Sequence, residues 1–310
     1  MDDSMDSVWD ENEGVELYKQ LSELWRKAGV SAPKWLSNSP LVMENIPLED
    51  RATEVDIDKE QLPSVKTLGL WWIAKEDITF KVNVPDNIGE LTKRDFLRKI
   101  SKLFDPMGFL APYLIRAKIL LQEIRSAGTK WDETLDECLT YKVTKWFQEL
   151  PKLVNVKVSR CLKLEKDKEI QVSEIQTFVD ASQDAYGAVV YIRNVYNIGT
   201  VSTHLVTAKT RVSPLTDISI RRMELMAAVV GLQLPKRIAK VLDMEIRNVT
   251  FWSDSLNVLW WICRRSRQYK PFVANRVGEI QSNTNPDQWR YVPTNKNPTD
   301  LLTRGFASQT

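Results

Sequence analysis

Apolar residues recur at helical intervals through much of the first half of the chain. Over residues 14–28 they fall on one side of a helix that stops at Gly29. The stretch that begins at Thr92, a candidate N-cap, has the same spacing and is interrupted by two prolines, which predicts two or three helices. A further helix is expected over residues 132–150.

Short strands are predicted before residue 80. The segments KWLSNSP (34–40) and SVKTLGLWWIA (64–74) are β-rich and bounded by Pro, Ser and Asn. We therefore predict a mixed α+β segment over residues 1–80 and a helical segment over residues 81–165. The charged run KLEKDKEIQVSE (163–174) is the expected linker or exposed strand pair that precedes the next domain.

The pattern changes to strands and helices after residue 170. Three β-rich runs, IQTFVDAS, AYGAVVYIRN and GTVSTHLVTAKTRV, are joined by short turns and predict three adjacent antiparallel strands. A long helical pattern runs from Ser219 to Leu242, and Pro235 is expected to kink or break it. A strand, two helices, a strand and a short helix complete the order β-β-β-α-β-α-α-β-α. Residues 170–310 are thus predicted to form an autonomous α/β domain with a mixed five-stranded sheet.

Composition excludes several classes of protein. Lys and Arg number 43 against 41 Asp and Glu, so the formal charge of +2 supplies no strong overall field, and any nucleic-acid contact must use a local basic patch. The three cysteines lie far apart, which argues against a disulfide framework or a zinc site. The single histidine, His204, excludes a metal site with two histidine ligands. No apolar run reaches the length of a membrane span, and we expect a cytoplasmic protein without membrane contact.

Four carboxylates stand at the edges of the predicted elements. Asp180 ends an apolar strand, Glu224 lies in the first turns of the long helix, Asp254 ends the fourth strand, and Asp300 opens the last helix. Converging carboxylates repel one another, and a bound divalent cation with a preference for oxygen ligands is the usual compensation. Each acid taken alone also fits an ordinary cap, as Asp254 does before the helix that starts at Ser255. Spacing does not decide between the two interpretations.

The residues around these acids resemble a known family. The blocks FVDAS, RMEL, WSDS and NPTD, in that order, resemble the ribonuclease H domain of retroelement polyproteins. More specifically, TLGLWW, TKRDFLRKISKLFDPMGFLAP, TKWDE and FVDASQDAYGAVVY resemble the reverse transcriptase to ribonuclease H region of BEL/Pao long-terminal-repeat retrotransposons. The resemblance implies a ribonuclease H-like fold for the second half of the chain.

The resemblance also implies chemistry. In that family such acids hold two Mg²⁺ or Mn²⁺ ions, and carried over they are Asp180, Glu224, Asp254 and Asp300, as metal ligands and catalytic residues. The implied substrate is the RNA strand of an RNA–DNA hybrid. Related enzymes often carry a histidine before the final acid, and the loop over residues 293–297 has none, so we expect slower turnover. The expected contacts to the hybrid are Ser182, Gln183, Asn257, Arg264, Arg265, Arg267 and Lys270, although the cationic run among them fits a solvated helix end equally well.

The first half resembles a truncated reverse transcriptase palm followed by thumb and connection regions. Asp2 and Asp3 after Met1 are similar to the end of the paired-acid turn of polymerases, and TLGLWW is similar to the primer-gripping hairpin. With the other polymerase elements absent, primer extension is not expected. The implied partner, besides the hybrid, is the rest of a retroelement polyprotein, and virus-like particles are one setting that the resemblance allows.

Two other functions compete with an active nuclease. One is a catalytically idle, domesticated or degenerate retrotransposon fragment that binds nucleic acid or a partner. The other is a transposase or integrase of the same fold, but those enzymes place their last acid on a long helix, whereas Asp300 opens a short one.

Overall fold

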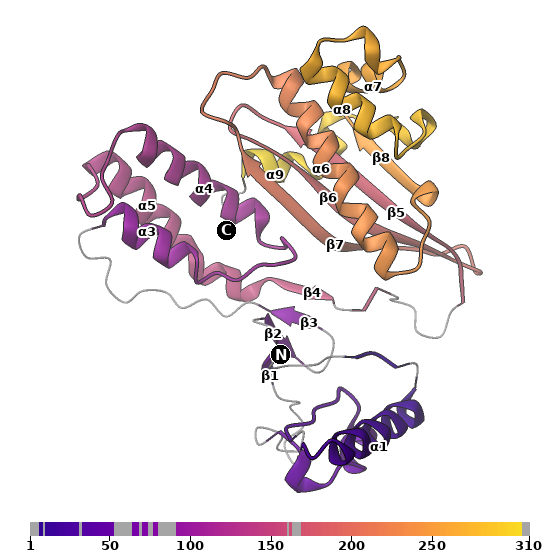
Figure 1. Ribbon diagram of the computed structural model, residues 1–310. Coiled ribbons are helices and arrows are strands. Elements are labelled where there is room, and N and C mark those ends of the chain that lie inside the picture. The colour runs from indigo at the N-terminus through magenta and orange to yellow at the C-terminus, as the bar shows by residue number, and fades with distance from the viewer. Residues whose placement is uncertain are drawn as a thin grey trace. The chain divides into compact units, whose positions relative to one another are not determined.

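The structure is a computed structural model that describes residues 6–8, 10–30, 33–52, 64–67, 70–73, 77–79, 91–159, 161–162 and 169–305. The chain divides into two compact units, residues 1–81 with 154–160 and residues 82–153 with 161–310 (Figure 1). The three-part division predicted from the sequence stays a prediction. In the structure the helical segment and the strand-rich segment belong to the same unit.

The first unit combines helices with a small antiparallel sheet. Its helices are α1 (Glu11–Lys27) and α2 (Pro40–Glu44), and its sheet has the order β1-β2-β3-β4, with β1 (Ser64–Thr67), β2 (Leu70–Ile73), β3 (Asp77–Thr79) and β4 (Lys157–Ser159). The Asp10 side chain caps α1 by accepting a hydrogen bond from the Glu13 N–H at 2.9 Å. The helix predicted over residues 14–28 is therefore confirmed, with its start three residues earlier.

One predicted strand in this unit is wrong, and another is confirmed. Over residues 34–40, Trp35 forms only an isolated bridge with Arg51, and Pro40 begins α2. A proline suits the first turn of a helix, because its fixed φ is helical and its missing N–H would have no partner there. The segment over residues 64–74 does form strands, since β1 and β2 pair antiparallel. Asp2 and Asp3 lie outside the described residues.

Three helices open the second unit, as the spacing predicts. They are α3 (Lys93–Ile100), α4 (Ala111–Ser126) and α5 (Glu137–Glu149). Thr92 caps α3, because its hydroxyl accepts a hydrogen bond from the Asp95 N–H at 3.2 Å. The rings of Phe96, Trp146 and Phe147 pack edge to face between these helices and are buried. These contacts hold α3 against α5, and Tyr113 of α4 stacks on Trp146 at a centroid distance of 4.7 Å.

A five-stranded mixed sheet forms the rest of the second unit. The strands β5 (Ile170–Ala181), β6 (Ala185–Tyr196) and β7 (Val201–Val212) are antiparallel, and β8 (Val249–Ser253) and β9 (Trp289–Tyr291) extend the sheet parallel to β5, in the order β7-β6-β5-β8-β9. The helices are α6 (Ile220–Val241), α7 (Leu256–Ile262), α8 (Pro271–Gln281) and α9 (Asp300–Arg304). The predicted order of elements and the α/β, ribonuclease H-like fold class are confirmed.

The predicted linker needs correction, and of the kink or break expected at Pro235 the break does not occur. Residues 170–174 of the expected linker belong to β5, while residues 163–168 lie outside the described residues. Helix α6 continues unbroken through Pro235. Gly231 lets this helix approach the sheet closely, because a Cβ there would lie 2.2 Å from Cγ1 of Val179. Within the described ranges, no helix has both the length and the hydropathy that crossing a bilayer requires.

Both faces of the sheet are covered. Adjacent strand residues point to opposite faces, so Val179 packs with α6, α7 and α8, whereas Phe178 faces the other way. On that second face Ala111 of α4 and Leu302 of α9 pack on Val189 and Ala208 of the sheet, together with neighbouring aromatic residues (Figure 1). Helix α4 therefore completes the core of the strand-rich segment.

The loop before α4 closes the edge of the sheet at β7. The Met107 carbonyl accepts hydrogen bonds from the Ala208 N–H at 2.8 Å and from the Thr207 hydroxyl at 2.7 Å. Asp105 shapes this loop by accepting hydrogen bonds from two backbone N–H groups, those of Phe109 and Leu110, at 2.9 and 2.8 Å. An edge strand with unpaired backbone groups is a site for unwanted pairing, and this loop protects it.

His204 gives a pH-dependent contribution to stability. It is buried on β7, where burial lowers its pKa and where its Nε2 has no hydrogen-bond partner among the described residues. The pKa of His204 is lower in the folded chain than in the unfolded chain, so the fold favours the neutral imidazole. The stability that depends on this neutral form is fully present above about pH 6.5 and is lost as the pH falls through the folded pKa. We expect the free energy of unfolding to decrease below that pH, and His204→Gln to remove this part of the dependence. Because His204 is the only histidine, its imidazole NMR signal gives the folded pKa directly; a value above 6.5 would contradict the expectation.

Candidate nuclease site

Two of the four acids lie side by side at the carboxyl ends of parallel strands. Strands β5 and β8 are parallel neighbours in which Val179 is opposite Ser253. Asp180 follows Val179 and Asp254 follows Ser253, so the register brings these two acids to the same edge of the sheet. The carboxyl ends of neighbouring parallel strands are the usual place for a site in α/β folds.

The other two acids come from helices. Glu224 lies in the second turn of α6, and Asp300 is the first residue of α9. Burial raises the pKa of Asp180; the Thr303 hydroxyl opposes the shift, and the charges of Asp254 and Asp300 add to it. Asp254 and Asp300 therefore lie close enough to Asp180 for their charges to act on it.

Neighbouring acids also act on Glu224. Burial raises its pKa, a hydrogen bond from Ser255 opposes the shift, and the charges of Asp254 and Asp180 add to it. The Ser255 hydroxyl donates to Oε2 of Glu224 at 2.6 Å. A raised carboxyl pKa means that the stability contributed by such a group is present below its unfolded pKa, about 4, and is lost as the pH rises through the folded pKa. Without a compensating cation, ionising Asp180 and Glu224 opposes folding.

The capping interpretation of Asp254 is wrong. The N-cap of α7 is Ser255, whose hydroxyl accepts a hydrogen bond from the Val258 N–H at 3.3 Å. Asp300 likewise lies inside α9, and the N-cap residue there is Thr299. The Asp254 carboxylate is therefore not explained by helix capping.

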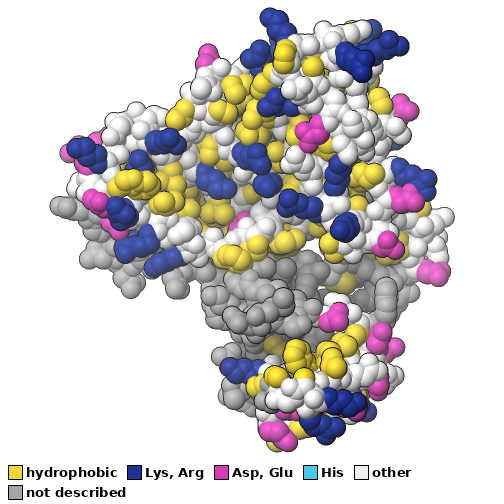
Figure 2. Space-filling model, viewed as in Figure 1, with side chains coloured by type: hydrophobic (Ala, Val, Ile, Leu, Met, Phe, Trp, Pro, Cys, Tyr) yellow, Lys and Arg dark blue, Asp and Glu magenta, His cyan; other side chains and the backbone are white. Residues whose placement is uncertain are grey.

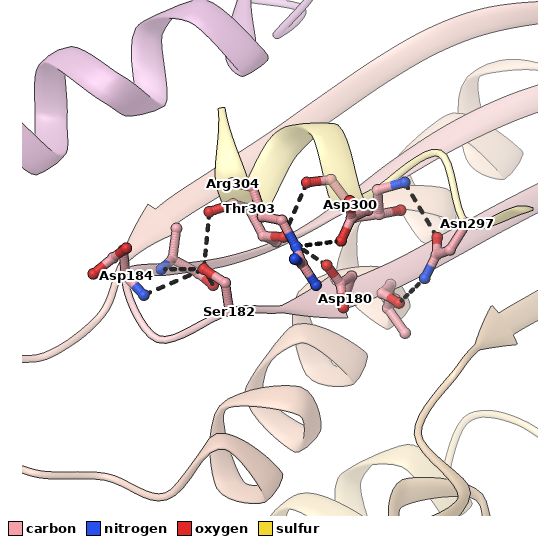
Figure 3. Close-up of polar contacts among 10 residues, drawn as sticks. Asp180, Ser182, Asp184, Asn297, Asp300, Thr303 and Arg304 are labelled. Carbon is pink, nitrogen blue, oxygen red and sulfur yellow. Dashed lines mark hydrogen bonds and ion pairs between the residues drawn. The ribbon is translucent and has the colours of Figure 1, made fainter. Parts of the chain in front are cut away.

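A set of hydrogen bonds holds α9 against β5 next to Asp180 (Figure 3). The Asn297 side-chain amide donates to the Val179 carbonyl at 3.0 Å, and the Thr303 hydroxyl donates to Oδ2 of Asp180 at 2.5 Å. The Ser182 hydroxyl donates to the Thr303 carbonyl at 2.9 Å. These contacts fix the position of Asp300, which the same short helix carries.

Asp300 is paired with an exposed cation. The Arg304 Nε lies 2.6 Å from Oδ1 of Asp300, one helical turn away, and two thirds of the Arg304 side chain is exposed (Figure 3). Exposed ion pairs contribute little, roughly 0–1 kcal/mol. A divalent cation that binds the Asp300 carboxylate more tightly than Arg304 does would displace Arg304 at a small cost in free energy.

The residues fit hard divalent ions by the chemistry of their donors. All four offer carboxylate oxygens, the ligands that Mg²⁺ and Mn²⁺ prefer. Among the described residues, no three His, Cys, Asp or Glu side chains lie close enough together to hold a metal ion as they stand. Hydrogen bonds and an ion pair engage the carboxylates of Asp180, Glu224 and Asp300 instead. The metal ligands named from the sequence therefore stay a prediction.

The predicted hybrid contacts fall into two groups. Ser182 is engaged in its own turn, where its oxygen accepts from the N–H groups of Asp184 and Ala185, as well as in the contact to α9. The others are exposed. Gln183 lies in the turn between β5 and β6, and the rest lie on α7 or in the segment before α8; they are Asn257, Arg264, Arg265, Arg267 and Lys270. None of the four cations in this group forms an ion pair with a described acid. The prediction that these residues contact nucleic acid remains open.

Sequence reasoning missed the residues that support the acids. Ser255, Asn297 and Thr303 each make a buried or partly buried hydrogen bond that positions an acid or its helix. Asn297 and Thr303 lie within the NPTDLLTRG segment, but a sequence does not show that these side chains reach a strand more than 100 residues earlier. It also missed Trp260, which is 60% exposed and stacks under the Arg264 guanidinium at 4.3 Å.

The role of Thr303 can be tested by removing its hydroxyl. In Thr303→Val, Asp180 loses a donor to its charged form, so its pKa should rise further and Mg²⁺ affinity at neutral pH should fall about 10-fold or more. Thr303→Ser keeps the hydroxyl, and its Mg²⁺ affinity should equal that of the natural chain. Calorimetric titration with Mg²⁺ compares the two variants, and equal affinities would show that the hydroxyl has no such role.

Comparison with known proteins identifies the family. A family model described as "Pao retrotransposon-like RNaseH-like domain" matches residues 92–255, more than half of the chain. The chain belongs to this family. The match includes Asp180, Glu224 and Asp254, and it also includes helices α3 to α5, so the Pao family unit joins the helical segment to the sheet. The resemblance to BEL/Pao elements seen in the sequence is confirmed.

Solved structures show similarities to the Pao-family chain at low identity. RNase H1 from Halobacterium salinarum NRC-1 is 13% identical with a TM-score of 0.26, over 40% of this chain and 89% of that one. The foamy viral protease-reverse transcriptase in complex with an RNA/DNA hybrid is 12% identical with a TM-score of 0.38, over 80% of this chain and 31% of that one. No curated protein matches the sequence.

Proposed function

We propose that this Pao-family chain is a metal-dependent ribonuclease H that hydrolyses the RNA strand of RNA–DNA hybrids. The observation that carries the proposal is the convergence of Asp180, Glu224, Asp254 and Asp300 from two parallel strands and two helices. Burial and the neighbouring acids raise the pKa of Asp180 and of Glu224, so the folded chain stores like-charge repulsion at this edge. Acids with raised pKa values gathered at a strand edge are typical of functional sites.

The four acids would hold two Mg²⁺ or Mn²⁺ ions. When bound at such a site, divalent ions activate water and stabilise the leaving 3′ oxygen of a phosphodiester. The contribution of the chain is to hold the carboxylates in place: Ser255 orients Glu224, Thr303 orients Asp180, and the Asn297 amide anchors the loop before Asp300. Hydrogen bonds to ligating carboxylates of this kind commonly tune metal affinity.

The exposed cations around α7 would contact the substrate. Arg264, Arg265, Arg267 and Lys270 follow the C-terminal end of α7, the helix that begins two residues after Asp254. Contacts to phosphates position a duplex without reading its sequence, and contacts to 2′-hydroxyls distinguish RNA from DNA. Other parts of a retroelement polyprotein would supply further contacts.

Metal binding tests the proposal without depending on turnover. Titration of the full chain with Mg²⁺ should show binding and a rise in melting temperature, larger at pH 8 than at pH 5, because more of the carboxylates are ionised at the higher pH. The double variant Asp180→Asn, Glu224→Gln should lose both effects while its melting temperature without metal stays equal or rises. Equal Mg²⁺ binding by the natural chain and the double variant would contradict the proposal.

A further inference from the structure

A second polar site lies away from the four acids, at the edge of the sheet formed by β7. A cavity of about 400 Å³ opens there between the loop before α4, strand β7 and the last turns of α6. Arg237 of α6 lines it, thirteen residues after Glu224, which corresponds to about 20 Å along a helix. The cavity is therefore separate from the candidate nuclease site.

The walls of this cavity carry excess positive charge. Lys118, Lys209 and Arg237 line it, and the acid among the lining residues is Asp105. The Asp105 carboxylate already accepts two backbone hydrogen bonds within its own loop. None of the three cations forms an ion pair with an acid in the part of the chain that the structure describes. Figure 2 shows Lys and Arg side chains gathered on the face between α4 and α6.

Helical spacing places two of these cations on the cavity side of their helices. Lys118 is one turn beyond Leu114 on α4, and Arg237 is three residues beyond Leu234 on α6, so each cation shares a face with an apolar residue that also lines the cavity. Burial lowers the pKa of the Lys118 amine, with Asp105 opposing the shift and Lys209 adding to it. The like charges are close enough to repel each other.

An unpartnered hydroxyl also lines the cavity. Thr210 is 7% exposed, and its Oγ1 is buried with no hydrogen-bond partner among the described residues. The hydroxyl of Thr207, three residues earlier on β7, donates to the Met107 carbonyl. Leaving a buried hydroxyl unpaired costs about 1–3 kcal/mol, which a ligand with an acceptor oxygen would recover.

We propose that this cavity, lined by Lys118, Lys209, Arg237 and Thr210, binds a phosphate group. A phosphate offers several acceptor oxygens and at least one negative charge, which matches three cations and a hydroxyl donor. The apolar floor, formed by Met107, Leu114, Leu234 and Ile238, suits a phosphate attached to an organic body such as a nucleotide. The phosphate comes from a free nucleotide or from a polynucleotide strand.

The test is a binding assay with the full chain in EDTA, where the four acids repel phosphate and hold no ion to attract it. The probes are inorganic pyrophosphate, a nucleoside triphosphate and a short single-stranded RNA, measured by calorimetry or fluorescence anisotropy. At least one probe should bind. Lys209→Glu and Arg237→Glu should each weaken that binding about tenfold or more, and Thr210→Val should weaken it without lowering the melting temperature. The probe that binds most tightly identifies the source of the phosphate.

Lys240→Glu is the matched control. Lys240 is exposed on α6, three residues after Arg237, and it does not line the cavity. The Lys240→Glu variant has the same change of charge as Arg237→Glu. Its affinity for the probe should stay within about twofold of that of the natural chain, because a screened surface charge acts weakly at a distance. Absence of binding by all three probes, or an equal loss in Lys240→Glu and Arg237→Glu, would overturn the proposal. Because the assay contains no divalent ion, its failure leaves the proposed nuclease function untouched.

Discussion

Asp254→Asn is expected to lower RNA-strand cleavage by about 100-fold or more while the fold stays intact. A carboxylate that balances metal charge in a buried site is worth this much when it is removed. The substitution keeps the size of the side chain and a hydrogen-bonding oxygen. Because Ser255 caps α7, the helix does not need the Asp254 carboxylate. Without metal, the melting temperature should stay equal or rise, since the acid adds to the repulsion felt by Asp180 and Glu224.

The matched control is Asp287→Asn. Asp287 is an exposed acid in the same unit, in the first turn of a short 3-10 helix. Its loss should change cleavage less than about twofold, because surface charges far from a site act weakly. Cleavage and thermal melting, with and without Mg²⁺, are measured for both variants and the natural chain. Unchanged cleavage in Asp254→Asn, beside measurable cleavage in the natural chain, would remove this residue from the site.

Gly108→Ala is expected to destabilise the second unit by about 2–5 kcal/mol. Gly108 has a φ of +77°, in the left-handed region, and a Cβ there would lie 1.9 Å from the Ala208 carbonyl oxygen. The strain of the backbone costs about 1–2 kcal/mol for an L-residue, and the clash adds about 1–3 kcal/mol. The loop would have to move away from β7 and would lose the hydrogen bond between Met107 and Ala208.

Gly128→Ala separates the cost of the left-handed backbone conformation from the cost of the steric clash. Gly128 has a φ of +78°, but a Cβ there meets no atom within 4 Å. This variant should lose only the conformational part, about 1–2 kcal/mol. The measurement is the free energy of unfolding from urea titration. Equal losses in the two variants would show that the contact between the loop and β7 contributes nothing to stability.

The sheet and its helices could be predicted because each element has its own periodicity. Three consecutive β-rich runs joined by short turns predicted β5, β6 and β7, and the long helical pattern of apolar residues predicted α6. The strand expected over residues 34–40 failed because the turn chemistry of Ser39 and Pro40 favours the start of a helix. Pro235 did not break α6, although its missing N–H removes one hydrogen bond of the helix. Tertiary packing overrides such a local preference when the helix covers a sheet.

The acids of the candidate site could be predicted from the sequence, but the residues that hold them in place by hydrogen bonds could not. A resemblance named Asp180, Glu224, Asp254 and Asp300, whereas periodicity alone left each of them as a possible cap. The hydrogen bond from Thr303 to Asp180 joins residues 123 positions apart, and no local pattern indicates it. The same holds for the packing of α4 on the second face of the sheet, which joins the helical segment to the strand-rich segment. Such contacts depend on the tertiary arrangement and become visible only in a structure.

That packing bears on the expectation that residues 170–310 fold on their own. Removal of α4 would expose Val189 and Ala208 and would free the edge of β7. Exposed apolar surface costs about 25 cal/mol per Å². The autonomy of the strand-rich segment remains a prediction, and the full chain is the better sample for activity measurements.

The most direct test of the proposed function is cleavage of an end-labelled duplex by the purified full chain. Four substrates are compared, an RNA–DNA hybrid labelled on either strand, double-stranded RNA and double-stranded DNA, each with Mg²⁺, Mn²⁺ or EDTA. We expect cleavage of the RNA strand of the hybrid only, dependent on the divalent ion, with a 3′-hydroxyl left on the upstream product. Binding of the hybrid without cleavage in either metal, by a chain that is folded by circular dichroism, would contradict a nuclease and would indicate an idle nucleic-acid-binding protein.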